Sequence, residues 1–481
     1  MLVASLPRIA ANVVSILSSD VMSRATTFVL YALVARHLGA HEFGQMSLAL
    51  TLFYTFQVLA AAGLKTLVTR EVAKDRAETG RYVVNGSLVA VAASGLAIVA
   101  LLVFVSLMDY APDTTSVILL LALGLLPFAL SAVCEAVFQA WERMHYIAYA
   151  NAPVNLAKMG LGFAVLQQGY GLNQVIAVMM LSQVVLVVIE WWVIAHRIER
   201  PILALDLPFA VHVARSTMTF LGIDALIAIA ASLNVVLLSK LSDEVEVGLY
   251  SAAFQLLSPV MLVLQSVVLS VFPMMCRHVD PGFEALRRIA EQVMALLLAL
   301  VLPLAVGLFF LAEPILLLLY AKRDFMQSTQ LLQVAVWGLI PTALMSVLGY
   351  VLMATHRERL TLGLVAAHAL GNLLIGLVVI GKFGALGAVA MVLLDKVLGL
   401  VEHYAIVSRL LPKVALSTRV WRPIVASACL AACLALVRDY GLIVSTISGG
   451  LVYAGVLLAL TIWSFGGPAQ LRAAYLRQWS E

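Results

Sequence analysis

The sequence is a succession of long apolar stretches, each separated from the next by a short polar break. A helix needs about 20 mostly apolar residues to cross a bilayer. Hydrophobic residues make up 63% of the 481 residues and charged residues only 12%, whereas a soluble domain is close to half apolar. We therefore predict an all-α polytopic membrane protein. The apolar pattern predicts about 14 spans, at residues 12–36, 44–65, 82–108, 115–140, 146–168, 172–195, 209–238, 247–275, 289–319, 328–354, 360–381, 384–409, 421–437 and 442–465.

Composition argues against several other classes of protein. The net charge of +4 is spread over short loops without a basic run, so we expect no nucleic-acid partner. The four cysteines lie in or beside apolar stretches, and the spacing of Cys429 and Cys433 matches no zinc motif. The loops are too short to form a soluble catalytic or nucleotide-binding domain. We expect no catalytic site, no metal and no cofactor.

The distribution of basic residues predicts an orientation. Lys and Arg are concentrated at one set of helix ends, with 19 residues there against 6 at the opposite ends. Basic loops stay in the cytoplasm. We therefore expect both termini on the cytoplasmic side of the membrane, which agrees with an even number of spans.

An internal repeat divides the chain. The motif Gly44-Gln-Met-Ser47-Leu-Ala49 returns 204 residues later as Gly248-Leu-Tyr-Ser251-Ala-Ala253. The pairs Gln139-Ala140 and Tyr170-Gly171 resemble Met353-Ala354 and Phe383-Gly384. Duplicated halves with a site between them are typical of transporters. We predict two pseudo-symmetric six-helix lobes, at residues 1–200 and 201–412, followed by two additional helices and a cytoplasmic tail at residues 413–481.

Ionisable residues lie inside the predicted spans. A charge at the centre of a membrane helix costs roughly 2.5–3.5 kcal/mol on insertion scales, so such residues are paired or face a polar cavity. The candidate cavity cations are Arg24, Lys158, Arg215 and Lys396. The candidate cavity or coupling acids are Asp20, Asp224, Glu135 and Asp395.

Two interpretations of these charges stay open. In the structural one they tie helices together, through Asp20–Arg24 on one helix face and Glu135–Lys158 between neighbours. In the functional one the cations hold an anion such as a phosphate ester, and the acids bind a proton or a sodium ion. Glu190 lies close to the cytoplasmic interface, and its side chain is expected to extend towards the interface.

One stretch resembles the opening of a known family. It runs through Leu38-Gly39-Ala-His-Glu-Phe43-Gly44, Ser47-Leu-Ala49, Gly63-Leu64 and Arg70-Glu71-Val-Ala73-Lys-Asp75. These residues look like the polysaccharide transporters, the O-antigen-type oligosaccharide flippases of the multidrug/oligosaccharidyl-lipid/polysaccharide exporter superfamily. The resemblance implies alternating access between two lobes in the bacterial inner membrane. The expected substrate is an undecaprenyl-pyrophosphate-linked oligosaccharide, held in a cationic cavity at Arg24, Lys158 and Arg215.

Three other functions are compatible with the sequence. A cation-coupled multidrug exporter of the same superfamily needs a cavity dominated by acids and aromatic residues, whereas cations and anions are balanced here. A membrane glycan polymerase or ligase needs acid–base groups at the outer face, where the predicted loops are short. A scaffold for other polysaccharide biosynthesis proteins is the third alternative. Membrane lipids are expected partners in every case.

Overall fold

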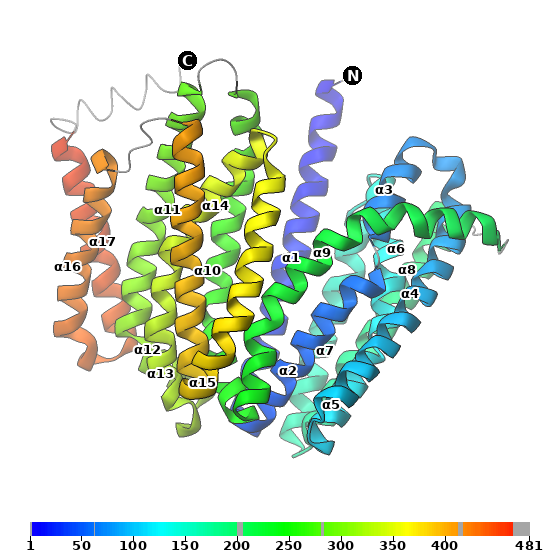
Figure 1. The fold of residues 1–481 in the computed structure, drawn as a ribbon, viewed down its shortest axis with the longest axis horizontal. Coiled ribbons are helices and arrows are strands. Elements are labelled where there is room, and N and C mark those ends of the chain that lie inside the picture. The colour runs from blue at the N-terminus through cyan, green and yellow to red at the C-terminus, as the bar shows by residue number, and fades with distance from the viewer. Residues whose placement is uncertain (1, 62, 200–204, 280–282, 412–416, 465–481) are drawn as a thin grey trace. The chain divides into compact units, whose positions relative to one another are not determined.

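The computed structural model describes residues 2–61, 63–199, 205–279, 283–411 and 417–464. Every regular element within these ranges is a helix (Figure 1). The chain forms two compact units, unit 1 at Met1–Gly248 and unit 2 at Leu249–Glu481. The predicted lobe boundaries stay a prediction, and the tail predicted after the last span, residues 466–481, lies outside the described ranges.

Unit 1 is built around α2. This helix contacts α1, α4, α5, α6 and α9, while α7 packs against both α1 and α8. The arrangement gives α1, α2, α7 and α8 a common interior, which contains a cavity. The helices are α1 (Leu2–Leu38), α2 (Ala40–Ala61), α3 (Leu64–Lys74), α4 (Thr79–Met108), α5 (Pro112–Ala122), α6 (Leu125–Ala140), α7 (His145–Gln167), α8 (Leu172–Val193) and α9 (Leu207–Leu241).

Unit 2 is built around α11 and α14. These two helices contact each other, α14 also packs against α15, and α11 packs against α16, which pairs with α17. The predicted span 289–319 is interrupted, because α11 ends at Phe310 and α12 begins after Leu311. The helices are α10 (Glu244–Arg277, which begins in unit 1), α11 (Glu284–Phe310), α12 (Ala312–Tyr320), α13 (Ser328–Ala335), α14 (Leu339–Ala354), α15 (Glu358–Leu410), α16 (Ser417–Val437) and α17 (Leu442–Ser464).

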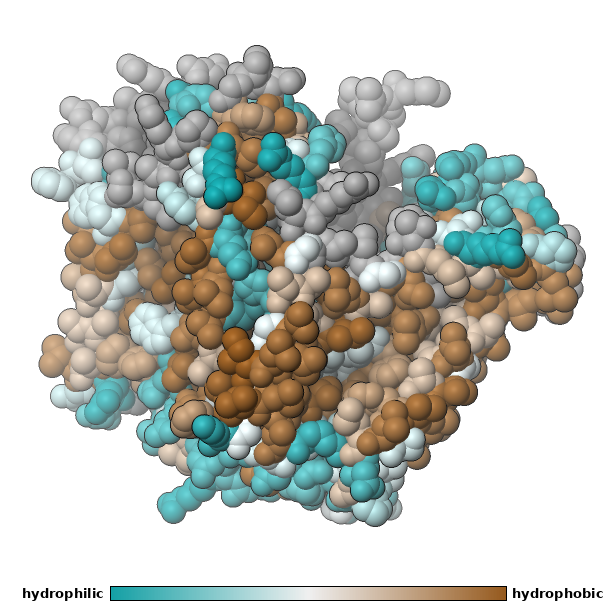
Figure 2. All heavy atoms as spheres, in the orientation of Figure 1, coloured by the Kyte–Doolittle hydropathy of each residue, from teal (hydrophilic) through white to brown (hydrophobic). Residues whose placement is uncertain are grey.

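The surface of these helices is that of a membrane protein. Large apolar side chains stay exposed on the flanks, for example Leu107 on α4 and Ile443 on α17 at 77% and 74% exposure. Figure 2 shows apolar residues over the flanks of the helices and hydrophilic residues gathered near helix ends. Such contiguous apolar surface is unstable in water and stable against lipid tails.

The number of spans depends on how the helices are divided. Among the described residues, eleven helical segments are long and apolar enough to cross a membrane. The predicted spans 12–36 and 146–168 lie on α1 and α7, and those at 360–381 and 384–409 fall within the single element α15. The membrane fold is confirmed, whereas the number 14 stays a prediction.

The repeated glycines Gly44 and Gly248 face each other. A Cβ atom on Gly44 would overlap the carbonyl oxygen of Glu244 and lie 2.9 Å from the nitrogen of Gly248. A Cβ on Gly248 would overlap the carbonyl of Ala40. The first turns of α2 and α10 therefore cross with their backbones in contact, which requires glycine on both sides.

The structure extends the repeat beyond the motifs noted in the sequence. Gly124-Leu-Leu-Pro127-Phe-Ala-Leu begins α6, and Gly338-Leu-Ile-Pro341-Thr-Ala-Leu begins α14. The two segments are 214 residues apart. In the turns after these helices, Glu142 and His356 keep the same offset and both have positive φ, 56° and 57°. The two halves thus share their backbone turns as well as their helix order.

The element α15 is a hairpin of two helical arms rather than one straight helix. Gly384 interrupts it at φ 54° and ψ −135°, a conformation available to glycine and costly for other residues. A Cβ on Gly387 would lie 3.0 Å from the carbonyl carbon of Val379 and 3.2 Å from the Cα of Ile380. The two arms therefore touch backbone to backbone where they meet. This agrees with the two separate spans predicted before and after Gly384.

Candidate functional site

Unit 1 contains a cavity of about 150 Å³ between α1, α2, α7 and α8. Its lining is mixed, with Asn151, Asn155 and Gln183 beside aromatic and aliphatic side chains. Lys158 is the one charged side chain that the described residues contribute to this lining. The cavity can therefore attract an anion and offer it amide donors.

Lys158 is held in the cavity by neutral partners. Its side chain is buried, at 8% exposure, and its Nζ donates to Oδ1 of Asn155 at 2.7 Å. A second, longer bond of 3.5 Å joins Nζ to Oγ1 of Thr27 on α1. An ammonium group has three donors, so at least one N–H has no protein acceptor among the described residues. A buried ammonium without a carboxylate is costly, and an anionic ligand would offset that cost.

The predicted pair Asp20–Arg24 is present. Nε of Arg24 lies 3.0 Å from Oδ2 of Asp20, and both side chains are about half exposed. Neither residue belongs to the cavity lining, although Ser23 and Thr27 of the same helix do. Arg24 is therefore close in sequence to residues that line the cavity, but its side chain forms a local ion pair with Asp20.

The predicted pair Glu135–Lys158 is replaced by another. Glu135 on α6 accepts from Nζ of Lys65 on α3 at 2.5 Å. Nearby, Glu190 on α8 is fully buried, and its Oε2 accepts from Ser131 at 2.6 Å. The expectation that Glu190 extends to the interface is wrong, because α8 turns this side chain towards α6. Its Oε1 has no protein partner within the described residues.

The remaining predicted residues fall in different surroundings. Arg215 and Asp224 on α9 are exposed and make no ion pair with any residue that the structure describes. Lys396 donates to Oδ2 of the adjacent Asp395 at 3.0 Å. The assignment of these residues to a substrate or ion site stays a prediction.

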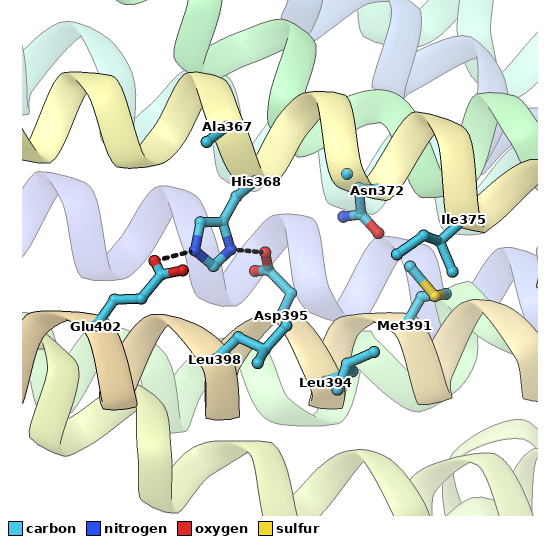
Figure 3. Close-up of a pocket in the computed structure, with 10 residues that line it drawn as sticks. Ala367, His368, Asn372, Ile375, Met391, Leu394, Asp395, Leu398 and Glu402 are labelled. Atoms are coloured by element: carbon cyan, nitrogen blue, oxygen red, sulfur yellow. Dashed lines mark hydrogen bonds and ion pairs between the residues drawn. The ribbon is translucent and has the colours of Figure 1, made fainter.

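Unit 2 contains a cavity of about 140 Å³ between the two arms of α15 (Figure 3). His368 reaches from the first arm to two carboxylates of the second. Its Nδ1 lies 2.6 Å from Oδ1 of Asp395, and its Nε2 lies 2.7 Å from Oε2 of Glu402. Sequence reasoning selected Asp395 but missed the histidine, because a lone histidine in an apolar helix carries no distinctive signal. The spacing of the two acids, seven residues and therefore one helix face, was the available clue.

Comparison with known families decides the identity. The family model for "Polysaccharide biosynthesis protein" matches residues 9–279, more than half of the chain. The chain belongs to the polysaccharide biosynthesis protein family. A second family model, "Lipid II flippase MurJ", matches residues 227–461. A search of curated proteins found no match.

Solved structures show the same fold for this polysaccharide biosynthesis family member. The lipid II flippase MurJ in an inward closed conformation matches with a TM-score of 0.72 at 12% identity, over 95% of this chain and 99% of that one. An inward-facing multidrug resistance MATE transporter of the MOP superfamily matches with a TM-score of 0.67 at 13% identity, over 82% and 96%. A point mutant of the Vibrio cholerae MATE transporter VcmN matches with a TM-score of 0.56 at 14% identity, over 84% and 96%.

In this family member the two cavities occupy equivalent places in the repeat. At the offset that relates Gly124 to Gly338, Lys158 corresponds to Asn372, which lines the cavity of unit 2. At the same offset Val154 corresponds to His368. The duplicated hairpins therefore keep a cavity at one position and differ in the charge that they place there.

Proposed function

We propose that this protein is a flippase. Its substrate would be an undecaprenyl-pyrophosphate-linked oligosaccharide, which it moves from the cytoplasmic to the outer leaflet of the bacterial inner membrane by alternating access. Membership of the polysaccharide biosynthesis family and the match to a lipid II flippase model support this class of function. Both termini would be cytoplasmic, as the basic residues suggest.

The observation that carries the proposal is the environment of Lys158. A buried ammonium with spare donors, surrounded by amides and no lining carboxylate that the structure describes, suits the pyrophosphate group. The cavity volume suffices for a few water molecules or one phosphate-sized group. The sugar and the polyprenyl chain would therefore lie outside it, and the cavity would recognise only the charged link between them.

A multidrug exporter is the second candidate. The structural matches to MATE transporters favour it at the level of fold. An organic cation would be repelled by Lys158, so the cavity of unit 1 argues for an anionic substrate. The cavity of unit 2 is lined by Asp395 and Glu402, which could attract an organic cation, and this observation favours testing the exporter.

A binding experiment separates the two candidates. The full chain in lipid nanodiscs is titrated with undecaprenyl pyrophosphate, with uncharged undecaprenol and with an organic cation such as ethidium. The flippase proposal expects preferential binding of the pyrophosphate lipid, which Lys158→Gln weakens and Lys158→Arg largely keeps. Lys382→Gln is the matched control, because Lys382 is exposed near the Gly384 turn and remote from the cavity in sequence.

The outcomes are distinct. Equal binding of the pyrophosphate and uncharged lipids would contradict a phosphate-recognising cavity. Tight ethidium binding that survives Lys158→Gln, without binding of the pyrophosphate lipid, would favour the exporter. In cells lacking the native flippase, loss of surface glycan with Lys158→Gln at unchanged protein level would connect the cavity to export.

A further inference from the structure

The cavity in unit 2 contains three titratable groups that nothing in the proposed substrate path uses. His368 lies on the first arm of the α15 hairpin, and Asp395 and Glu402 lie two turns apart on the second. Figure 3 shows the imidazole between the two carboxyl groups, with one ring nitrogen directed at each. The histidine is therefore the one polar link joining both acids across the hairpin among the residues that the structure describes.

The hydrogen bonds fix the number of protons in this cluster. A carboxylate is only an acceptor, and a neutral imidazole has one N–H. Both short contacts can be hydrogen bonds only if both ring nitrogens donate, or if one carboxyl group is itself protonated. The closed arrangement thus holds one proton more than a neutral histidine with two carboxylates.

The geometry suits a proton better than a metal ion bound through the histidine. The two carboxyl groups lie on opposite sides of the ring and do not converge on a common point (Figure 3). Within the described part of the chain, no set of three His, Cys, Asp or Glu side chains could hold a metal. A metal ion ligated by the imidazole would need a free ring nitrogen, and both nitrogens of His368 already face an oxygen.

The charges around the cluster determine which of the two contacts, His368–Asp395 or His368–Glu402, is lost when the histidine releases a proton. Asp395 also accepts from Lys396, whereas Glu402 has no further hydrogen-bond partner within the described ranges and interacts electrostatically with the adjacent His403. The neighbouring His403 is directed at the carbonyl of Gly399, at 2.7 Å. Of the elements packed against α15, helix α13 and the short 3-10 helix Val336–Gly338 supply no titratable side chain, and α14 supplies only Tyr350.

The same cavity contains an unsatisfied polar atom. Oδ1 of Asn372, one turn from His368 on the first arm, is buried and has no protein partner among the described residues. A buried acceptor of this kind is usually satisfied by water. Water beside Asn372 would give a proton a hydrogen-bonded route to the cluster.

We propose that His368, Asp395 and Glu402 form a proton-binding clamp that closes the α15 hairpin. With the proton bound, the imidazolium donates to both acids and ties the two arms together. When the ring nitrogen facing Glu402 releases its proton, two acceptors oppose each other there, and the half-exposed Glu402 turns away while Asp395 stays with Lys396. The site goes beyond the flippase proposal, since it concerns the hairpin of unit 2 and not substrate recognition.

Two measurements on the full chain in nanodiscs test the clamp without any substrate. The first is ¹⁵N NMR of labelled histidine across a pH series, with His368 assigned by the loss of its signals in His368→Gln. We expect His368 to exchange one ring proton over the series. Asp395→Asn and Glu402→Gln should each shift that titration. His196→Gln, a control at an exposed histidine of unit 1 that faces the carbonyl of Trp192, should leave it unchanged.

The second measurement is the distance between spin labels at Leu370 and Val401, which are exposed positions on the two arms. The four native cysteines are replaced first. The distance should change over the pH range in which His368 titrates, and His368→Gln should abolish that change.

A single protonation state of His368 at every pH would overturn the clamp, as would a titration indifferent to both acid variants or an inter-arm distance independent of pH. Because neither readout needs a transported lipid, failure of the flippase proposal would leave this result intact. Failure of the clamp would likewise leave the flippase proposal intact.

Discussion

The cavities of units 1 and 2 occupy the same place in the repeat and carry opposite chemistry. In unit 1, Lys158 is buried among neutral amides and hydroxyl groups. In unit 2, Asn372 stands at the equivalent position, and two carboxylates with a histidine supply the charge instead. The turns and glycines that shape the two halves are kept. The two halves therefore keep a common backbone while their cavity side chains differ, a buried cation in unit 1 and a histidine with two acids in unit 2.

The largest expected effect follows from reversing the charge of the unit 1 cavity. Lys158→Glu should abolish detectable binding of undecaprenyl pyrophosphate. Lys158→Gln should weaken it by about 2–4 kcal/mol, roughly 30- to 1,000-fold, as for truncation of a buried charge partner. Isothermal titration in nanodiscs measures the change. Unaltered affinity for undecaprenyl pyrophosphate in both variants would show that the charge of Lys158 does not make the unit 1 cavity an anion site.

The second prediction concerns the backbone that the halves share. Gly44→Ala adds a methyl group where the carbonyl of Glu244 lies, so we expect a loss of about 1–3 kcal/mol in unfolding free energy, typical of overpacking. Thermal unfolding of the purified protein provides the measurement. Gly349→Ala is the control, because its Cβ would meet nothing within 4 Å. Equal melting temperatures for both variants would show that the crossing of α2 and α10 tolerates a side chain.

A third prediction transfers an acid from one cavity to the other. Ser182 lines the unit 1 cavity and, at the offset that relates Gly171 to Gly384, corresponds to Asp395. Ser182→Asp should give Lys158 a carboxylate and lower the affinity for undecaprenyl pyrophosphate about tenfold, near 1.4 kcal/mol. Ser182→Asn keeps the size without the charge and should bind almost as the wild type does. If the two variants bind equally, charge is not what distinguishes the cavities.

The smallest effect is expected for a charge outside both cavities. Asp206 caps α9 by accepting from the backbone N–H of Phe209, and Arg81 donates to its Oδ2 at 2.7 Å. The hydrogen bond from Arg81, together with the one from the N–H of Phe209, holds the pKa of Asp206 below its usual value. A carboxyl group whose pKa is lowered in the folded state stabilises the fold above its unfolded pKa, near 4, and that contribution is lost as the pH falls further.

Asp206→Asn should therefore remove a small part of the acid sensitivity of thermal unfolding and leave lipid binding unchanged. Melting curves between neutral and acidic pH would record it. A large effect on lipid binding would mean that charge matters wherever it lies in unit 1, contrary to the comparison of the cavities.

The sequence was most informative about elements whose signal is local. Apolar length predicted the spans, and the motif at Gly44 and Gly248 predicted equivalent helices. The first turns of α2 and α10, at Ala40 and Glu244, keep the predicted offset of 204 residues. The break between the predicted spans 360–381 and 384–409 also marked the turn at Gly384, where glycine is favoured because few other residues adopt its backbone conformation.

Pairing between helices could not be predicted in the same way. Which cation meets Glu135 depends on the rotation of α6 about its own axis, and the structure selects Lys65 instead of Lys158. His368 was missed because its partners lie 27 and 34 residues away, across the hairpin. The burial of Glu190 likewise depends on the face that α8 turns to α6. Composition and periodicity do not determine such rotations when a helix is apolar on every side.

The turn at Gly384 acts as a hinge that joins the two arms of the hairpin at one end. The arms are in contact at the turn, so they can separate only by pivoting there. His368 lies 16 residues from Gly384, which is about 24 Å along a helix. A tilt of about 5° therefore moves the arms about 2 Å apart at the histidine, enough to break a hydrogen bond. Because the displacement grows with distance from the turn, the gain or loss of one proton at His368 would change the separation most at the arm ends near Glu358 and Leu410.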